Sequence, residues 1–350
     1  MGDNINVFFD FAGACRYHYP AFGAGRPFFR DGCIGVARMS AGKSLDALRR
    51  EIDRIDDAIH DLIRRRTQIV ERVRDLKAND RIKIRPSRED EIIYRLMAAH
   101  RGNFPKRELA RIWREVIVAT LSFEGPFTAA VYAPDRARSC WDLARDQYGS
   151  FTPMTTHPSA RRVIEKVGAG DATVGILPLP RQDDADPWWP HLMASEPDGP
   201  RIIARLPFAG PGNTRFQDAQ ALVVSPVDRE PTARERSLIA VEVAEDLGQA
   251  RIAEALREAG LSPCQIIAWR ETHGLGMCLY LAELDGFVLA EDRSLARFSS
   301  ALGDRVIRVA RLGGYGTPLT PEDLAVVPEE PAPASTPSRS TPRKTRTRRK

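Results

Sequence analysis

Residues 44–77 read SLDALRREIDRIDDAIHDLIRRRTQIVERVRDLK, and apolar side chains recur in this stretch at alternating steps of three and four. This spacing predicts the apolar face of one long amphipathic helix. No Gly or Pro interrupts it, and Ser44 is a suitable N-cap. The helix would be about 50 Å long, so we expect it to pack against another chain or several shorter helices. The apolar positions are Leu45, Leu48, Ile52, Ile55, Ile59, Leu62, Ile69, Val73 and Leu76.

One cation interrupts this apolar face. Continuing the three-four step from Leu62 leads to Arg66, and Lys77 returns to nearly the same face three turns later. Arg49 points about 100° away from Arg66, toward whatever packs on the neighbouring face. A lone Arg at such a position usually extends its guanidinium into solvent. Two cations on one stripe also fit a pocket for an anionic ligand, and both interpretations stay open.

Length and composition limit the class of protein. At 350 residues the chain is long enough for two or three domains, and its 43% hydrophobic content contains no run that approaches a membrane span. The five cysteines are scattered without a metal-binding or disulfide spacing, which favours a reducing, cytoplasmic location. They are Cys15, Cys33, Cys140, Cys264 and Cys278.

The two ends of the chain differ from its middle. Residues 1–38 mix Phe with Gly, Arg and Pro without periodicity, and their acids argue against a signal peptide. We interpret them as a disordered leader or a mis-assigned start. Residues 325–350 form a basic, Pro/Ser/Thr-rich segment, which indicates a disordered tail and accounts for most of the net charge of +5. Such a tail is usually a solvated appendage, and weak contact with RNA or DNA is the less expected alternative.

Two further helices are predicted after a polar connection. Residues 86–89 (PSRE) place Pro and an acid in a first helical turn, and a Gly and a Pro end this helix. A third helix is expected from Lys106 to Phe123, followed by Gly and Pro. Together the three helices predict an α-helical domain at residues 39–126. The expected inward residues of the third helix are Leu109, Ile112, Trp113, Val116, Ile117 and Leu121.

These helices resemble the all-helical class of chorismate mutase, as found in the mutase part of bifunctional mutase–prephenate dehydratases. The resemblance covers residues 44–124. It implies an intertwined dimer in which the long helices pair and each active site borrows one Arg from the partner chain. The residues that carry it are Leu48-Arg49, Ile52, Ile55-Asp56, Arg64-Arg65-Arg66, Lys77, Pro86-x-Arg88-Glu89, Thr120 and Glu124.

The resemblance also implies roles for the polar residues. Arg49 would enter the partner's site, and Arg66, Lys77 and Arg88 would bind the carboxylates and ether oxygen of chorismate. Glu89 would accept a hydrogen bond from the substrate hydroxyl, and Thr120 and Glu124 of the third helix would complete the pocket. The catalytic residues among them would be Arg66, Lys77, Glu89 and Glu124.

The implied reaction explains the absence of a nucleophile or metal motif. Rearrangement of chorismate to prephenate is pericyclic, so the site need only hold the compact conformer and stabilise charge on the ether oxygen, without a cofactor. The chain departs from the family at Arg85, where Asp is frequent, and at Glu124, where Gln is usual. Glu124 must be protonated to donate a hydrogen bond, or else it merely ends the third helix in solvent.

Residues 127–228 are predicted to form a small α/β lobe, because strands and helices alternate. The lobe weakly resembles one lobe of a prephenate dehydratase. Thr214-Arg215-Phe216 matches a motif of that family, whereas Pro178-Leu179-Pro180-Arg181 replaces its Pro-Ile-Glu-Asn. A second lobe is missing, so dehydratase activity is not expected. The predicted elements are strands 128–132, 151–154 and 172–177 and helices 137–148 and 160–167.

Residues 234–318 are predicted to form a second α/β unit in the order β-α-β-β-α-β. This order resembles the ACT regulatory module that follows dehydratases. Arg270 stands where that family has the Arg of Glu-Ser-Arg-Pro, so it is a candidate effector-binding residue. The residues around it differ, and a structural or dimerising role is equally expected. The predicted elements are strands 238–243, 265–270, 276–284 and 306–312 and helices 248–259 and 296–302.

The sequence therefore predicts a multidomain α + α/β protein with a three-helix mutase module, a small dehydratase-like lobe and an ACT-like domain. The predicted function is a cytoplasmic, homodimeric chorismate mutase of phenylalanine and tyrosine biosynthesis, acting on chorismate without a cofactor. The alternative from another class is a non-catalytic regulatory dimer that senses chorismate or an aromatic amino acid.

Overall fold

The computed structural model describes residues 44–76, 84–134, 139–193, 199–212, 218–270 and 278–328. Its compact units are residues 1–61 and 62–350, so the boundary between them falls inside the first helix. Within the described ranges, no helix combines the length and the apolar content that crossing a membrane requires.

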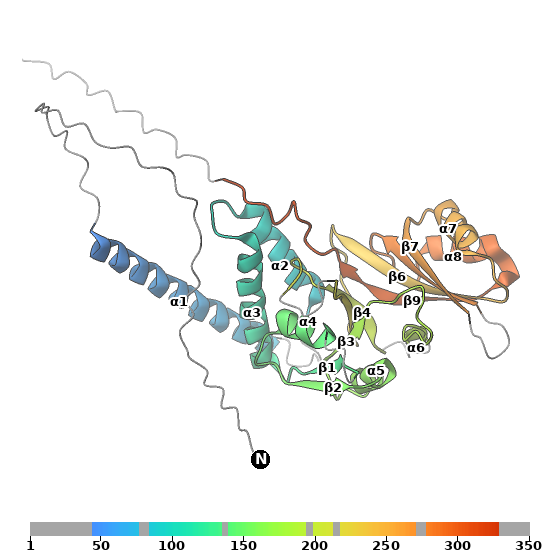
Figure 1. Ribbon diagram of the computed structural model, residues 1–350, viewed down its shortest axis with the longest axis horizontal. Helices are drawn as coiled ribbons and strands as arrows, with labels where there is room; N and C mark the ends of the chain where they lie inside the picture. The colour runs from blue at the N-terminus through green and yellow to red at the C-terminus, as the bar shows by residue number, and fades with distance from the viewer. Residues whose placement is uncertain are drawn as a thin grey trace, which may run out of the picture. The chain divides into compact units, whose positions relative to one another are not determined.

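The long helix predicted from the sequence is present as α1, which runs from Leu45 to Leu76 (Figure 1). The Ser44 hydroxyl accepts a hydrogen bond from the Ala47 N–H at 3.2 Å, as expected of an N-cap. No residue of α1 is buried, and its apolar face is exposed: Ile52 is 57% and Ile59 is 51% accessible. Among the described residues, this apolar face is therefore exposed.

The second and third helices are α2 (Pro86–Ala99) and α3 (Lys106–Glu124), which pack against each other. Pro86 lies in the first turn of α2, where its missing N–H costs no helical hydrogen bond. The core between the helices also includes two residues from far along the chain. Its buried members are Ile93, Met97, Ala110, Ile117, Phe208 and Leu319.

The inward face of α3 differs in part from the prediction. Ile112 was expected to face inward, but 46% of it is exposed. Arg114 is buried instead, together with Ala110 and Ile117. The inward face is therefore rotated toward Arg114, because a buried Arg with acidic partners replaces an apolar residue there.

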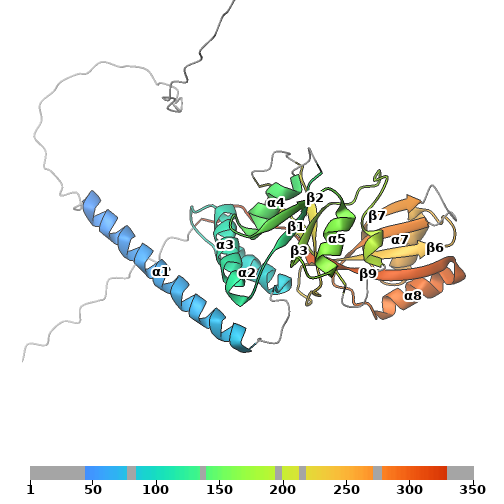
Figure 2. The same cartoon turned by 90° about the horizontal axis from the view of Figure 1, so that it is seen from below.

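The residues described after α3 form one nine-stranded sheet with helices packed on it (Figures 1 and 2). The strand order is β2-β1-β3-β5-β4-β9-β6-β8-β7. The strands are β1 Ala129–Tyr132, β2 Met154–His157, β3 Val174–Pro178, β4 Arg201–Leu206, β5 Ala221–Ser225, β6 Glu235–Val243, β7 Pro263–Arg270, β8 Cys278–Asp285 and β9 Val306–Gly316. The helices are α4 Ser139–Tyr148, α5 Ala160–Gly168, α6 Pro190–Met193, α7 Gln249–Glu258 and α8 Arg293–Leu302, followed by the short 3-10 helix Gly303–Arg305.

The two α/β units expected from the sequence share this sheet. Strand β4 pairs in parallel with β9 through Ile202 and Gly313. Gly313 has a φ of +117°, and a Cβ there would lie 2.2 Å from the Ile202 carbonyl oxygen. A side chain at this position would therefore disrupt the junction, so Gly is required. Strand pairing across such a distance in the chain left no local signal in the sequence.

Each face of the first half of the sheet has its own helix. On β1, Ala129 and Val131 join the cluster that contains α4, whereas Ala130 joins the cluster that contains α5. This alternation is what a strand buried on both faces requires. The first half of the sheet is therefore a three-layer arrangement in which the strands lie between α4 and α5.

The second half of the sheet confirms the predicted order β6-α7-β7-β8-α8-β9. Ile239, Val241 and Val243 of β6 pack under α7 and α8. Leu238 and Ala240 alternate with them and pack on the opposite face. Helices α7 and α8 therefore cover one face of these strands.

Four strands of the first half were predicted at shifted positions or not at all. The strand expected at 151–154 lies instead at Met154–His157, because Phe151 is 98% exposed and Pro153 has no N–H to donate. Strands β4 and β5 were not predicted. The strand expected at 172–177 is shifted to Val174–Pro178.

Candidate functional site

Arg66 of α1 and Thr120 of α3 are brought together by the fold. The Arg66 Nη1 donates to the Thr120 Oγ1 at 3.3 Å and lies 3.4 Å from the Val116 carbonyl oxygen. Thr120 is buried, and its hydroxyl donates to the Ile117 carbonyl at 2.7 Å. Arg66 therefore does not extend freely into solvent, which was the simpler interpretation of a cation on this face. Its guanidinium lies against α3, next to the buried Thr120 hydroxyl.

Glu89 lies in the first turn of α2 and is buried. Its Oε2 accepts from the Arg114 Nη1 at 3.1 Å. The Arg114 Nη2 lies 3.5 Å from the neighbouring Asp90. The Glu89 Oε1 is also buried and has no hydrogen-bond partner among the described residues. One carboxylate oxygen of Glu89 is thus held by Arg114, and the other retains its accepting capacity.

The ion pair of Glu89 and Arg114 is part of a larger buried ionic network. The Arg229 Nη1 donates to Asp90 at 3.0 Å and to the Ile203 carbonyl at 2.8 Å. The other guanidinium nitrogens of Arg229 donate to Glu235 on β6 at 2.8 and 3.0 Å. Five charged residues therefore connect α2 and α3 to the sheet. They are Glu89, Asp90, Arg114, Arg229 and Glu235, and all are buried.

Burial dominates the protonation of the two acids on α2. Desolvation raises the pKa of Glu89 above its ordinary value, although the Arg114 charge opposes the shift. Desolvation likewise raises the pKa of Asp90, against the charges of Arg229 and Arg114. Each carboxyl therefore takes up a proton at a higher pH than an exposed acid would.

Two predicted site residues are exposed and engaged elsewhere. Arg88 lies 3.4 Å from Glu91 on the outer face of α2, because successive helical residues point in different directions. Arg49 lies 3.3 Å from Asp46, one turn earlier on α1. Among the described residues, Arg88 joins neither Glu89 nor Thr120.

Other predicted residues lie outside the described part. Lys77 and Thr214-Arg215-Phe216 fall outside the described ranges. Glu124 is the last residue of α3, and its side chain is likewise not described. Their roles stay predictions.

The candidate effector residue Arg270 closes β7 and is exposed. Its guanidinium donates to Asp246, which also accepts from the Tyr280 hydroxyl at 2.5 Å. The hydrogen bond from Tyr280, followed by those from Gly248 and Arg270, lowers the pKa of Asp246. Arg270 is thus part of an ion pair on the surface, and effector binding by it stays a prediction.

Sequence reasoning missed the partners of Glu89. Arg114 lies on the inward stripe of α3, four residues after the buried Ala110 and three before Ile117. A cation at such a position was the available signal, and it is the same signal that had marked Arg66. Arg229 offered no signal, because its acidic partner Asp90 is 139 positions away in the chain.

The helical region was compared with models of known protein families.

Residues 48–125 match chorismate mutase type II.

The match confirms the resemblance to chorismate mutase over the segment that holds Arg49, Arg66 and Thr120. The bifunctional chorismate mutase/prephenate dehydratase of Aquifex aeolicus (strain VF5) is 31% identical over 142 residues, which cover 39% of this chain and 39% of that protein. The chain spans about two-fifths of the length of the curated relatives that it matches.

Solved structures show a more distant likeness. A structure of GqqA, described as a novel type of quorum quenching acylase, is 15% identical, with a TM-score of 0.40 over 57% of this chain and 98% of that chain. The prephenate dehydratase from Arthrobacter aurescens in complex with L-Phe is also 15% identical, with a TM-score of 0.40 over 56% of this chain and 94% of that chain. At these values the likeness supports no functional assignment.

Proposed function

We propose that this protein is a chorismate mutase that forms prephenate in the biosynthesis of phenylalanine and tyrosine. The observation that carries the proposal is the chorismate mutase type II match, which spans α1, α2 and α3. It is supported by the contact of Arg66 with Thr120, which places a cation beside a buried hydroxyl from residues 54 positions apart.

The proposed mechanism relies on charge and shape alone. Arg66 and Lys77 bind a substrate carboxylate and the ether oxygen, on which negative charge grows in the transition state. Glu89 accepts from the substrate hydroxyl through its Oε1, since its Oε2 is held by Arg114. Thr120 contributes its hydroxyl to the pocket. The compact conformer of chorismate is held by these contacts, which lowers the entropy cost of the rearrangement.

We further propose that the active form is a homodimer with paired α1 helices. The exposed apolar face of α1 supports this, because covering each large apolar side chain contributes about 1.5–3 kcal/mol. In such a dimer Arg49 would enter the partner's site, and its exposure in the single chain is consistent with that arrangement. Arg88 would bind a substrate carboxylate together with Arg66 and Lys77.

The test is the reaction itself, followed on the full chain. Purified protein should consume chorismate and release an equal amount of prephenate. A helical fragment ending near residue 126 is a poor substitute, because Phe208, Leu319 and Arg229 pack on α2 and α3. Chorismate that stays unchanged with folded, dimeric protein would contradict the proposal.

Two other functions were considered: a non-catalytic regulatory dimer and a prephenate dehydratase. Neither the family match nor the relatives support the alternative of a non-catalytic regulatory dimer. The curated relatives are named as bifunctional mutase/prephenate dehydratases, but we expect no prephenate dehydratase activity from this protein. Assaying phenylpyruvate in the same reaction, with Thr214→Ala as the comparison, tests this expectation.

A further inference from the structure

The first turn of α2 carries two residues that the proposed function assigns to the substrate, Arg88 and Glu89. In the structure this turn is held by residues 228–235, which join the first half of the sheet to β6. That segment lies outside residues 48–125, the part of the chain that matches chorismate mutase type II. The position of the turn therefore depends on contacts that the matched helices do not supply.

Ser87 makes the first of these contacts, with the main chain of residue 230. Its hydroxyl donates to the Glu230 carbonyl oxygen at 2.7 Å and accepts from the Glu230 N–H at 3.0 Å. A hydroxyl can do both at once, and Ser87 is only 5% exposed, so water competes little for either bond. One side chain of α2 is thus bound to both backbone groups of a single residue of the segment.

Arg229 makes the second contact. Its Nη1 donates at 3.0 Å to Asp90, the neighbour of Glu89, and its other nitrogens bind Glu235 at 2.8 and 3.0 Å. The Arg229 and Asp90 side chains are 1% and 6% exposed. A planar guanidinium that is bonded to two carboxylates has little freedom to turn. Arg229 therefore ties the residue beside Glu89 to strand β6.

The end of β9 packs tightly against the same contacts. A Cβ at Gly316 would lie 2.6 Å from the Asp90 Oδ2 and 3.1 Å from the Arg229 Nη2. One turn after Asp90, the Tyr94 hydroxyl donates to the Thr317 carbonyl at 2.5 Å. Packing this close resists a shift of α2 against the sheet.

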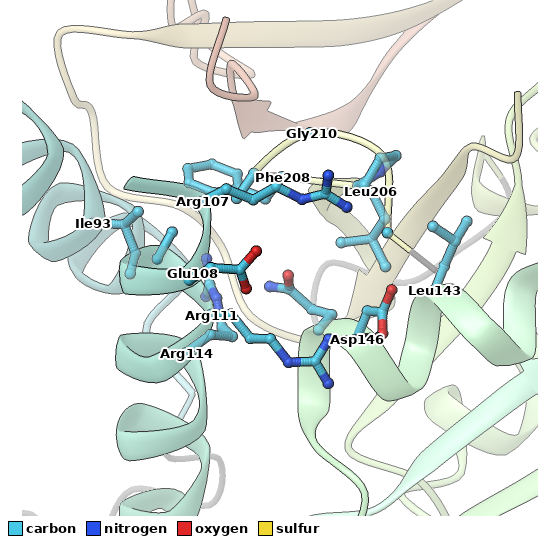
Figure 3. Close-up of a pocket in the computed structure, with 15 residues that line it drawn as sticks. Ile93, Arg107, Glu108, Arg111, Arg114, Leu143, Asp146, Leu206, Phe208 and Gly210 are labelled. Carbon is cyan, nitrogen blue, oxygen red and sulfur yellow. Dashed lines mark ion pairs between the residues drawn. The ribbon is translucent and has the colours of Figure 1, made fainter. Parts of the chain in front are cut away.

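Glu89 is also held indirectly, through its partner Arg114. Figure 3 shows Arg114 on α3 and Phe208 in the loop after β4, and the guanidinium lies 5.2 Å from the centroid of the Phe208 ring. The same guanidinium donates to the Glu89 Oε2 at 3.1 Å. Residues outside the matched helices thus contact both the α2 turn and the Arg that binds Glu89.

We propose that residues 228–235 position the first turn of α2 for the mutase reaction, with Ser87 and Arg229 as the positioning residues. The inference rests on the proposed function, because it concerns how the same site holds chorismate. Ser87 and Arg229 act through Arg88 and Glu89, whose places they fix. The effect is measurable, because a displacement of about 1 Å in an active site can reduce the rate about a hundredfold.

The experiment measures kcat and KM for chorismate on the full chain. Ser87→Ala removes both hydrogen bonds to residue 230 and leaves the backbone of α2 unchanged. We expect KM to rise about fivefold or more, because the substrate-binding turn is no longer fixed. A protein that is only partly folded has fewer active molecules, so its apparent kcat falls while KM stays the same. The control is Ser300→Ala on α8, an exposed Ser whose hydroxyl donates to the Ala296 carbonyl of its own helix.

Arg229 provides an independent pair of variants. Arg229→Lys keeps a positive charge near Asp90 but loses the fork, and Arg229→Gln loses the charge as well. KM should therefore rise in the order wild type, Arg229→Lys, Arg229→Gln. The control is Arg251→Gln, which removes a surface Arg that pairs with Glu254 and Glu258. If Arg229→Gln fails to unfold cooperatively, Arg229→Lys and Ser87→Ala decide the question.

The possible results separate this inference from the proposed function. Wild type that forms no prephenate overturns both. Active wild type with an unchanged KM in Ser87→Ala and Arg229→Lys overturns the inference alone. A fall in kcat at constant KM also overturns it, because the contacts then only stabilise the fold.

Discussion

The guanidinium of Arg114 on α3 holds the carboxylate of Glu89 on α2 at 3.1 Å, with side chains that are only 7% and 9% exposed. Glu89 is the acid that the proposed reaction assigns to the substrate hydroxyl. Arg114 therefore acts as a positioning residue, since it fixes one oxygen of Glu89 and leaves the other available. Through Asp90 and Arg229 the same network reaches Glu235 on the sheet.

Removing Arg114 should destabilise the protein. Arg114→Gln leaves Glu89 and Asp90 without one of their buried cations, and breaking a buried ion pair in this way costs about 3–5 kcal/mol. Urea unfolding measures the loss, with Arg95→Gln on the exposed face of α2 as the control. If the two variants unfold at the same urea concentration, the network does not stabilise the fold.

The raised pKa of Glu89 should appear in the pH dependence of stability. The native state keeps the Glu89 proton at pH values where the unfolded chain has lost it, so the native state binds more protons in that window. The free energy of unfolding therefore falls as pH rises from the ordinary Glu pKa toward the raised one. Glu89→Gln, which cannot ionise, should show a smaller fall.

The matched control for this measurement is Glu91→Gln. Glu91 is exposed on the same helix and pairs with Arg88 at the surface. Unfolding is followed in urea at pH values spanning about 4 to 8. A fall of equal size in wild type and Glu89→Gln would show that Glu89 ionises normally.

The dimeric site predicts complementation between two inactive variants. Arg49→Ala and Arg66→Ala should each lose activity, because removing a charged anchor for a buried carboxylate costs about 2–5 kcal/mol. If Arg49 acts in the partner's site, heterodimers of the two variants have one site with both arginines. Mixing after joint unfolding and refolding should restore measurable activity. Mixtures no more active than the separate variants would place both residues in one chain's site.

Glu124 predicts an unusual pH profile. If Glu124 faces the ether oxygen, as the proposed function requires, only its protonated form can donate a hydrogen bond there, so turnover should fall as pH rises through its pKa in the substrate complex. Glu124→Gln always offers a donor, so it should flatten the profile and raise activity at alkaline pH. The assay is kcat between about pH 5 and 9 for both proteins. Parallel profiles would mean that Glu124 only ends α3.

Local patterns in the sequence predicted much of the helical region. The three-four spacing between Leu45 and Leu76 predicted α1, and the Pro at residue 86 predicted where α2 begins. Arg66 was marked because a charge interrupted an apolar pattern, and the structure places it against Thr120. These features depend on residues a few positions apart, which a sequence displays directly.

The features that were not predicted from the sequence depend on contacts between segments that are distant in the chain. Arg114 was missed as the partner of Glu89, and the rotation of α3 that buries it exposes Ile112. The pairing of Ile202 with Gly313 joins two expected units into one sheet, and no local pattern reports it. Tertiary packing decides both, so residue spacing alone could not predict them.

The rate of prephenate formation by the full-length protein tests the central claim most directly. The rate should be compared between wild type, Arg66→Ala and Arg65→Ala. Arg65 is the exposed neighbour of Arg66, so Arg65→Ala is the control. We predict that wild type and Arg65→Ala convert chorismate to prephenate at similar kcat/KM. Arg66→Ala should be at least a hundredfold slower, which corresponds to about 2.7 kcal/mol of lost transition-state stabilisation. Equal rates for Arg66→Ala and Arg65→Ala, or no prephenate from folded wild-type protein, would contradict the account.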